Sequence, residues 1–186
     1  MLRVILLDSP CRAIVATACF LLLTPVSRGE PVGNPTAQSL EVIAQSLSFL
    51  QGAPSGELSL GIVYPVPSEQ AHSAARQIEL AFGSGIKAGQ LTLHPRLLTI
   101  REAMNTQEVV ALFLTDAALP SAAEIATALA GKGILTITSD PGVVIGGLVV
   151  MAVRCKPRTE IYVSRTAARL AGVEFSTPFR LIIQER

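Results

Sequence analysis

Short apolar segments alternate with amphipathic helix patterns along this chain, and this alternation constrains the fold more than any other feature. Residues 109–114 (VVALFL) and 134–138 (ILTIT) have the length and composition of strands that are buried on both faces of a sheet. Strands that alternate with helices usually pair in parallel through right-handed crossovers. The sequence therefore predicts an α/β class: a three-layer domain with a mostly parallel sheet.

The predicted elements follow from apolar spacing and from helix start and stop signals. Helices are expected over 37–50, 69–82, 121–130 and 165–171, a short helix over 100–105, strands over 58–64, 91–98, 109–114, 134–138, 148–154 and 159–163, and an extended segment over 175–183. Ser121 is the expected N-cap of its helix, with Glu124 as capping-box partner. The connection 155–158 is too short for a crossover helix, so the last two strands are predicted to form an antiparallel hairpin at the C-terminal edge of the sheet.

Residues 1–29 have the three-part pattern of a secretory signal peptide. Arg3 and Arg12 supply the positive region, residues 14–23 are almost entirely apolar, and small residues precede a cleavage position near Gly29. The apolar run is about half as long as the roughly 20 residues that a membrane-spanning helix needs, so a permanent anchor is the weaker interpretation. We expect export to the periplasm by a cleaved signal peptide.

The mature chain is then expected to have a flexible leader over 30–36 and a single domain over 37–186. Cleavage removes Cys11 and Cys19, which leaves Cys155 as the only cysteine and rules out an internal disulfide. An unreactive cysteine at a strand end is the favoured interpretation of Cys155. An intermolecular disulfide and a thiolate activated by neighbouring cations are the alternatives.

Charge and aromatic content argue against nucleic acid as a partner. The full chain has 15 Lys and Arg against 14 Asp and Glu, and removal of the predicted signal peptide turns the formal charge slightly negative. No basic cluster is interleaved with aromatic residues, and tryptophan is absent. A nucleic-acid surface normally combines clustered basic residues with aromatic side chains on which bases stack.

Catalytic and metal-binding patterns are weak. His72 and His94 are the only histidines, and no cysteine or carboxylate stands at ligand spacing from either, so neither a metal nor another cofactor is expected. A triple of Ser139, His94 and Asp116 can be drawn, but no nucleophile elbow supports it. The glycines in 83–87 end a helix and lack the pattern of a phosphate-binding loop. We therefore expect a protein that is not an enzyme.

A small-ligand site is the alternative that the predicted topology leaves open. Tyr64, Thr115, Asp116, Ser139 and Asp140 all fall at the carboxyl ends of predicted parallel strands, where open α/β sheets bind ligands. Polar residues at these positions are also ordinary turn and cap formers.

Residues 138–150 (TSDPGVVIGGLVV) combine a turn signal with a glycine pair. Asp140 to Gly142 is expected to end a buried parallel strand. Gly146 and Gly147 are expected to relieve crowding where the chain re-enters the sheet, at a switch from parallel to antiparallel strands.

Residues 131–182 resemble the YfiR-like family of small exported regulators. The similar pieces are a Gly-Lys before a strand, a strand ending in Ser-Asp, a Gly-Gly-hydrophobic start to the next strand, a strand running into an alanine-containing helix, and a serine in the last segment. The signature residues are Gly131, Lys132, Asp140, Gly146, Gly147, Ala171 and Gly172, followed by Ser176. Members commonly have an aromatic-rich first helix and a Trp-Pro, which this chain lacks.

The resemblance implies a noncatalytic periplasmic regulator that inhibits a membrane-bound diguanylate cyclase. It would bind the periplasmic portion of that membrane protein and so lower cyclic di-GMP output. A homodimer is an open possibility. The alternative function is a single-lobe periplasmic solute-binding protein of a transport or sensing system.

Overall fold

The computed structural model describes residues 35–52, 55–155 and 157–186, which belong to one compact unit. The predicted signal peptide and residues 30–34 of the predicted leader lie outside the described residues, so the division into leader and domain stays a prediction. Thr36, at the end of the predicted leader, caps the first helix, because its hydroxyl oxygen accepts the backbone N–H of Ser39 at 3.2 Å.

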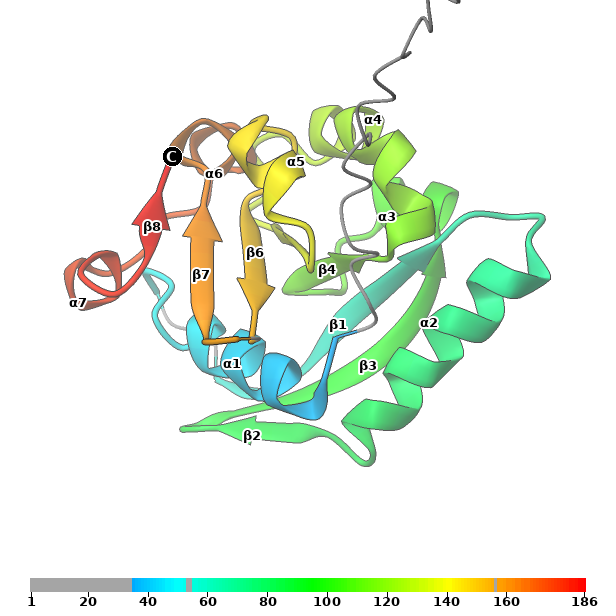
Figure 1. Ribbon diagram of the computed structural model, residues 1–186, viewed down its shortest axis with the longest axis horizontal. Coiled ribbons are helices and arrows are strands. Elements are labelled where there is room, and N and C mark those ends of the chain that lie inside the picture. The colour runs from blue at the N-terminus through cyan, green and yellow to red at the C-terminus, as the bar shows by residue number, and fades with distance from the viewer. Residues whose placement is uncertain (1–34, 53–54, 156) are drawn as a thin grey trace, which may run out of the picture. The chain divides into compact units, whose positions relative to one another are not determined.

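A mostly parallel sheet forms the middle layer of this unit (Figure 1). Its order within the described residues is β2-β3-β1-β4-β5-β6-β7-β8. The strands are β1 (Gly56–Tyr64), β2 (Ile86–Ala88), β3 (Leu91–Thr99), β4 (Ala111–Leu114), β5 (Leu135–Thr138), β6 (Met151–Arg154), β7 (Glu160–Val163) and β8 (Gln184–Glu185). Strands β3, β1, β4, β5 and β6 are parallel, and β2 pairs antiparallel with β3. The predicted antiparallel hairpin is β6–β7, and the short β8 adds to it in parallel with β7.

Helices cover both faces of the sheet, which confirms the predicted three-layer α/β class. Apolar side chains of α1, α2, α6 and α7 share one core cluster with the sheet, and those of α3, α4 and α5 share the other. Leu60 and Ile62 of β1 belong to the first cluster and Val63 to the second, because successive residues of a strand point to opposite faces. The helices are α1 (Ala37–Leu47), α2 (Glu69–Phe82), α3 (Ile100–Asn105), α4 (Ala122–Ala128), α5 (Pro141–Ile145), α6 (Arg165–Ala171) and α7 (Thr177–Arg180), with a 3-10 helix η1 (Asp116–Ser121) before α4.

Local capping signals explain where α2 and α6 begin. The hydroxyl oxygen of Ser68 accepts the backbone N–H of Ala71, and that of Ser164 accepts the backbone N–H of Ala167. Both helices have the predicted bounds. The predicted cap at Ser121 is wrong, because η1 continues directly into α4 and Ser121 makes no capping hydrogen bond.

Two further predictions of local structure are wrong, and strand β2 was not predicted. The segment 175–183 contains α7 instead of being extended throughout. The stretch 138–150 contains α5, and β6 after it is still parallel to β5, so the switch to antiparallel pairing comes later, between β6 and β7.

Candidate functional site

Two of the predicted ligand residues at the strand ends have structural partners. Thr115 is buried, and its hydroxyl donates to the backbone oxygen of Val63 at 2.7 Å, which ties the end of β4 to β1. The ring of Tyr64 packs against the ring of His72, with centroids 5.1 Å apart. These contacts account for both residues without a ligand.

Asp116 and Asp140 are close enough to interact electrostatically. Partial burial raises the pKa of Asp116, and the negative charge of Asp140 raises it further. Asp140 also caps α5, because its Oδ1 accepts the backbone N–H of Gly142 at 2.8 Å. Ser139, the fifth predicted residue, is buried. Within the described ranges no cluster of three or more candidate metal ligands occurs, and the ligand role of this strand edge stays a prediction.

His94 does not complete a triad with Ser139 and Asp116. It lies on β3, where a Cβ at Gly85 would come within 2.9 Å of its Cε1 atom. Its Nε2 atom is buried and has no hydrogen-bond partner in the part of the chain that the structure describes. The triple that the sequence allows is therefore not assembled as a catalytic unit.

The family-signature residues meet in two places, of which the first is a turn after α4. Gly131 has a φ of 71° and its N–H donates to the carbonyl oxygen of Leu170 at 2.9 Å, so the turn packs on the end of α6. The Lys132 ammonium donates to the carbonyl oxygen of Met104 at 3.0 Å, near the end of α3. Ala171 is buried and Gly172 ends α6 with a φ of 74°. Gly131, Lys132 and Gly172 therefore join three helices beside the sheet.

Gly146 and Gly147 form the second place, at the end of α5. Gly147 has a φ of 75°, a conformation that disfavours other residues. Gly146 has a φ of −70°, and a Cβ there would have its nearest contact at 3.5 Å. The predicted relief of crowding is therefore wrong for both glycines. The backbone angle requires a glycine at position 147, whereas neither the available space nor the backbone angle requires one at position 146.

These signature residues lie within the segment that is similar to a known family. The family model described as YfiR/HmsC-like matches residues 67–179, which is more than half of the chain. The chain belongs to the YfiR/HmsC-like family.

Solved structures similar to this YfiR/HmsC-like chain share its fold. One is a conserved domain protein from Vibrio cholerae O1 biovar El Tor, with a TM-score of 0.56 and 11% sequence identity over 82% of this chain and 60% of that one. Another is the ABC domain in complex with L-Trp from Streptococcus pneumonia, with a TM-score of 0.51 and the same identity and coverage. This chain thus spans 60% of the length of each, and at this identity the similarity concerns the fold alone.

No curated protein matches the chain. None of the helices among the described residues is both long enough and apolar enough to cross a membrane.

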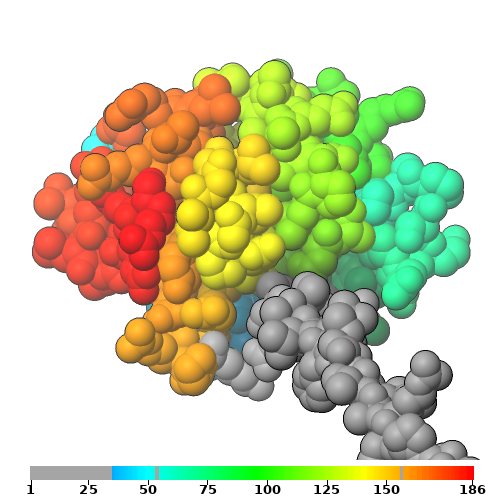
Figure 2. All heavy atoms as spheres, turned by 45° about the horizontal axis from the view of Figure 1, so that its top comes forward, coloured from blue at the N-terminus to red at the C-terminus, as the bar shows by residue number. Residues whose placement is uncertain are grey.

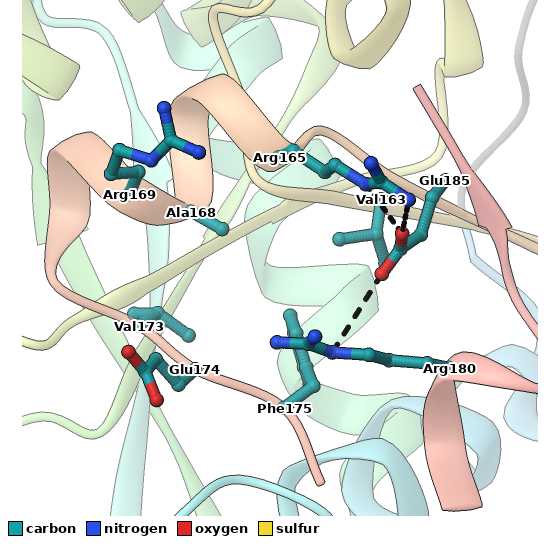
Figure 3. A pocket seen from close by; sticks show the side chains of 9 residues that line it. All are labelled: Val163, Arg165, Ala168, Arg169, Val173, Glu174, Phe175, Arg180 and Glu185. Carbon is teal, nitrogen blue, oxygen red and sulfur yellow. Dashed lines mark hydrogen bonds and ion pairs between the residues drawn. The ribbon is translucent and has the colours of Figure 1, made fainter. Parts of the chain in front are cut away.

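A pocket of about 370 Å³ lies between α6, α7 and β8 (Figure 3). We call it the arginine pocket. Its lining residues are Val163, Arg165, Ala168, Arg169, Val173, Glu174, Phe175, Arg180 and Glu185. Apolar side chains form part of the wall, and three arginines and two glutamates supply the charge.

The charges of the arginine pocket fall into two groups. Glu185 forms ion pairs with Arg165 and with Arg180, the latter at 3.8 Å. Arg169 and Glu174 lie on the other side of the pocket in Figure 3 and form no ion pair with any described residue. The pocket therefore offers one guanidinium whose charge is not neutralised by a neighbour.

Sequence reasoning missed the arginine pocket. Its charged residues come from α6, the segment after it, α7 and β8, and only the tertiary fold brings them together. The spacing of Arg165 and Arg169, four residues apart on one face of α6, was the only available signal.

Proposed function

We propose that the chain is a noncatalytic periplasmic regulator that binds the periplasmic portion of a membrane-bound diguanylate cyclase and lowers its output of cyclic di-GMP. In this proposal residues 1–29 are a cleaved signal peptide and the leader 30–36 precedes one domain, 37–186. The mature protein acts as a monomer or a homodimer and needs no cofactor.

The match of residues 67–179 to the YfiR/HmsC-like family carries this proposal. The matched segment includes the turn at Gly131 and the end of α6 at Gly172, so it covers the hydrogen-bonded joint between the turn after α4 and the end of α6. Thr115 and Asp140 were both candidates for a small-ligand site. The hydrogen bond of Thr115 and the helix cap formed by Asp140 give each of them a structural role, which favours a regulator over a solute-binding protein.

The test is to delete the gene and to measure cyclic di-GMP in the bacterium. We expect the concentration to rise, and the full-length chain supplied from a plasmid to restore it. A matched chain that lacks residues 1–29 should accumulate in the cytoplasm and fail to restore control. Unchanged cyclic di-GMP after deletion, under several growth conditions, would contradict the proposal.

Binding of a small solute is the second candidate function. The observation in its favour is the fold shared with the ABC domain in complex with L-Trp, together with the meeting of Asp116 and Asp140 at the strand edge. Thermal unfolding of the purified mature protein against a library of solutes tests it, since a ligand that binds only the folded state raises the melting temperature. A specific increase that Asp140→Asn abolishes would favour this candidate.

A further inference from the structure

We propose that the arginine pocket is the surface that binds the partner, and that the partner inserts an acidic segment in which apolar side chains flank a carboxylate. The inference rests on the proposed function, because it assumes that the chain acts by contact with another protein. Three features of the pocket support it: its charge, its apolar surroundings and its exposure.

The charge of the pocket selects a carboxylate. Three guanidinium groups face two glutamates, and Arg169 has no ion-pair partner among the described residues. A guanidinium binds a carboxylate through two parallel hydrogen bonds, which gives both strength and orientation. Glu174 repels a carboxylate placed beside it, so the incoming group is expected next to α6, between Arg169 and Arg165, which both project from that helix.

The existing pairs of Glu185 do not block such a contact. The side chain of Arg165 is 70% exposed and that of Arg180 is 54% exposed. Exposed ion pairs contribute little to stability. A carboxylate from a partner can therefore share or replace Glu185 at either arginine at little cost in free energy.

Exposed apolar side chains accompany these arginines. Leu170 follows Arg169 directly, and Leu181 and Ile182 follow Arg180, with exposed fractions of 47%, 83% and 64%. Leu181 is the most exposed large apolar residue in the part of the chain that the structure describes. Arginine combined with large apolar groups is the composition of energetically important interface residues. In Figure 2 the segments from α6 to β8, orange to red, lie together at the surface beside α5.

The exposure favours a protein segment over a small molecule. Pockets for small ligands enclose most of the ligand surface, whereas the side chains of Arg165 and Arg180 in this pocket are more than half exposed. A protein segment can cover Leu181 and Ile182 while it places a carboxylate between the arginines. It thus buries apolar area that a small anion would leave in water.

Photo-crosslinking in the living bacterium tests the surface. A benzoylphenylalanine at position 181 should form an adduct with a membrane protein, and the same group at Leu80 should not. Leu80 is a matched control because it is a leucine with 74% exposure on the separate helix α2. Mass spectrometry of the adduct should identify a partner peptide that contains Asp or Glu next to apolar residues.

Charge reversal at the unpaired arginine tests the chemistry. Arg169→Glu should lower the adduct yield from position 181 by roughly tenfold, the effect expected for loss of a charge-assisted contact. Arg169→Lys should retain most of the yield. Arg101→Glu is the control, since Arg101 is an exposed arginine on α3 without an ion pair among the described residues. All three variants should unfold at the temperature of the wild type.

Several results would overturn the inference: no adduct from position 181, equal yield from positions 181 and 80, an adduct formed only with a second copy of the chain, a partner peptide without a carboxylate, or a yield unaffected by Arg169→Glu. Cyclic di-GMP measurements separate this outcome from failure of the proposed function. An adduct with a membrane protein that has no cyclase domain would uphold the surface and contradict the function. If the Arg169→Glu variant still lowered cyclic di-GMP as the wild type does, the function would be upheld and the surface contradicted.

Discussion

The backbone N–H of Gly131, in the turn after α4, donates to the carbonyl oxygen of Leu170, near the end of α6, at 2.9 Å. Two residues further on, the N–H of Gly133 donates to the carbonyl oxygen of Ala171 at 2.8 Å. Carbonyl groups at the end of a helix have no partner within the helix, so the turn after α4 satisfies the end of α6. The turn that contains Gly131 and Gly133 thereby connects the end of α4 to the end of α6.

Replacement of Gly172 should weaken this joint. Its φ is 74°, and a Cβ would lie 3.5 Å from the Cα of Gly131. We expect Gly172→Val to lower the free energy of unfolding by more than Gly133→Val, by roughly 1 kcal/mol, because a larger side chain pushes the turn away from α6. Gly133 is the matched control, since it has a φ of 71° and open space around the Cβ position. Equal losses for the two variants in urea unfolding would contradict the packing argument.

The glycine pair at the end of α5 should respond asymmetrically. Gly146→Ala should leave stability unchanged or raise it by about 0.4–1 kcal/mol, since its φ of −70° suits alanine and the unfolded chain loses freedom. Gly147→Ala should lower the free energy of unfolding by roughly 1 kcal/mol, because its φ of 75° strains a residue with a Cβ. Thermal unfolding of the two variants measures the difference. A larger loss from Gly146→Ala would show that α5 is packed differently.

Elements that depend on local signals could be predicted from the sequence. Helix α2 has a serine cap, an apolar stripe and a glycine stop within 68–83, and its predicted bounds agree with the structure. Strand β4 is a continuous apolar run and β5 is a short run of mostly β-branched residues, so their burial could also be predicted. The class of fold follows from their alternation with helices.

Elements that depend on distant partners could not be predicted. Helix α7 forms where Phe179 packs between Phe49 and Phe175, and Phe49 lies at the other end of the domain sequence. Strand β2 has only three residues and is defined by its pairing with β3. The sequence predicted that Asp116 and Asp140 lie at the same edge of the sheet, and the two do interact. The charged residues of the arginine pocket come from four segments, so no compact motif in the sequence indicates it.

Truncation of Phe179 should destabilise the protein strongly. The side chain is 1% exposed, with ring centroids 5.2 Å from Phe49 and 5.0 Å from Phe175. Phe179→Ala should lower the free energy of unfolding by about 3–5 kcal/mol through lost burial and a cavity. Leu181→Ala is the control two residues away, and at 83% exposure it should change stability by less than about 0.5 kcal/mol. Similar effects of the two variants would mean that α7 is not packed as described.

The buried hydroxyl of Thr115 should contribute to the joint between β1 and β4. Thr115→Val keeps the shape of the side chain but removes the hydroxyl that donates to the backbone oxygen of Val63, so the free energy of unfolding should fall by about 1 kcal/mol. Thr115→Ser retains the hydroxyl, and hydrogen exchange at the end of β4 should be faster in the valine variant than in the serine variant. Ligand-binding assays test the alternative role. If both variants failed to bind a solute that the wild type binds, Thr115 would belong to a ligand site instead.

Glu160 should make stability depend on pH in the acid range. Hydrogen bonds from Arg154, then Arg158 and Tyr162, lower the pKa of Glu160 from 4.5 to about 2. A carboxylate whose pKa is lower in the folded state stabilises the fold above its unfolded pKa, and this contribution is lost as pH falls from about 4.5 towards 2. The stability difference between wild type and Glu160→Gln should therefore be largest near neutral pH and should shrink steadily below pH 4.5. Urea unfolding of both proteins at a series of pH values measures it, and added salt should reduce the difference, because Arg154 and Arg158 are exposed. A difference that stays constant from neutral pH down to pH 2.5 would show that the three donors do not hold Glu160 ionised.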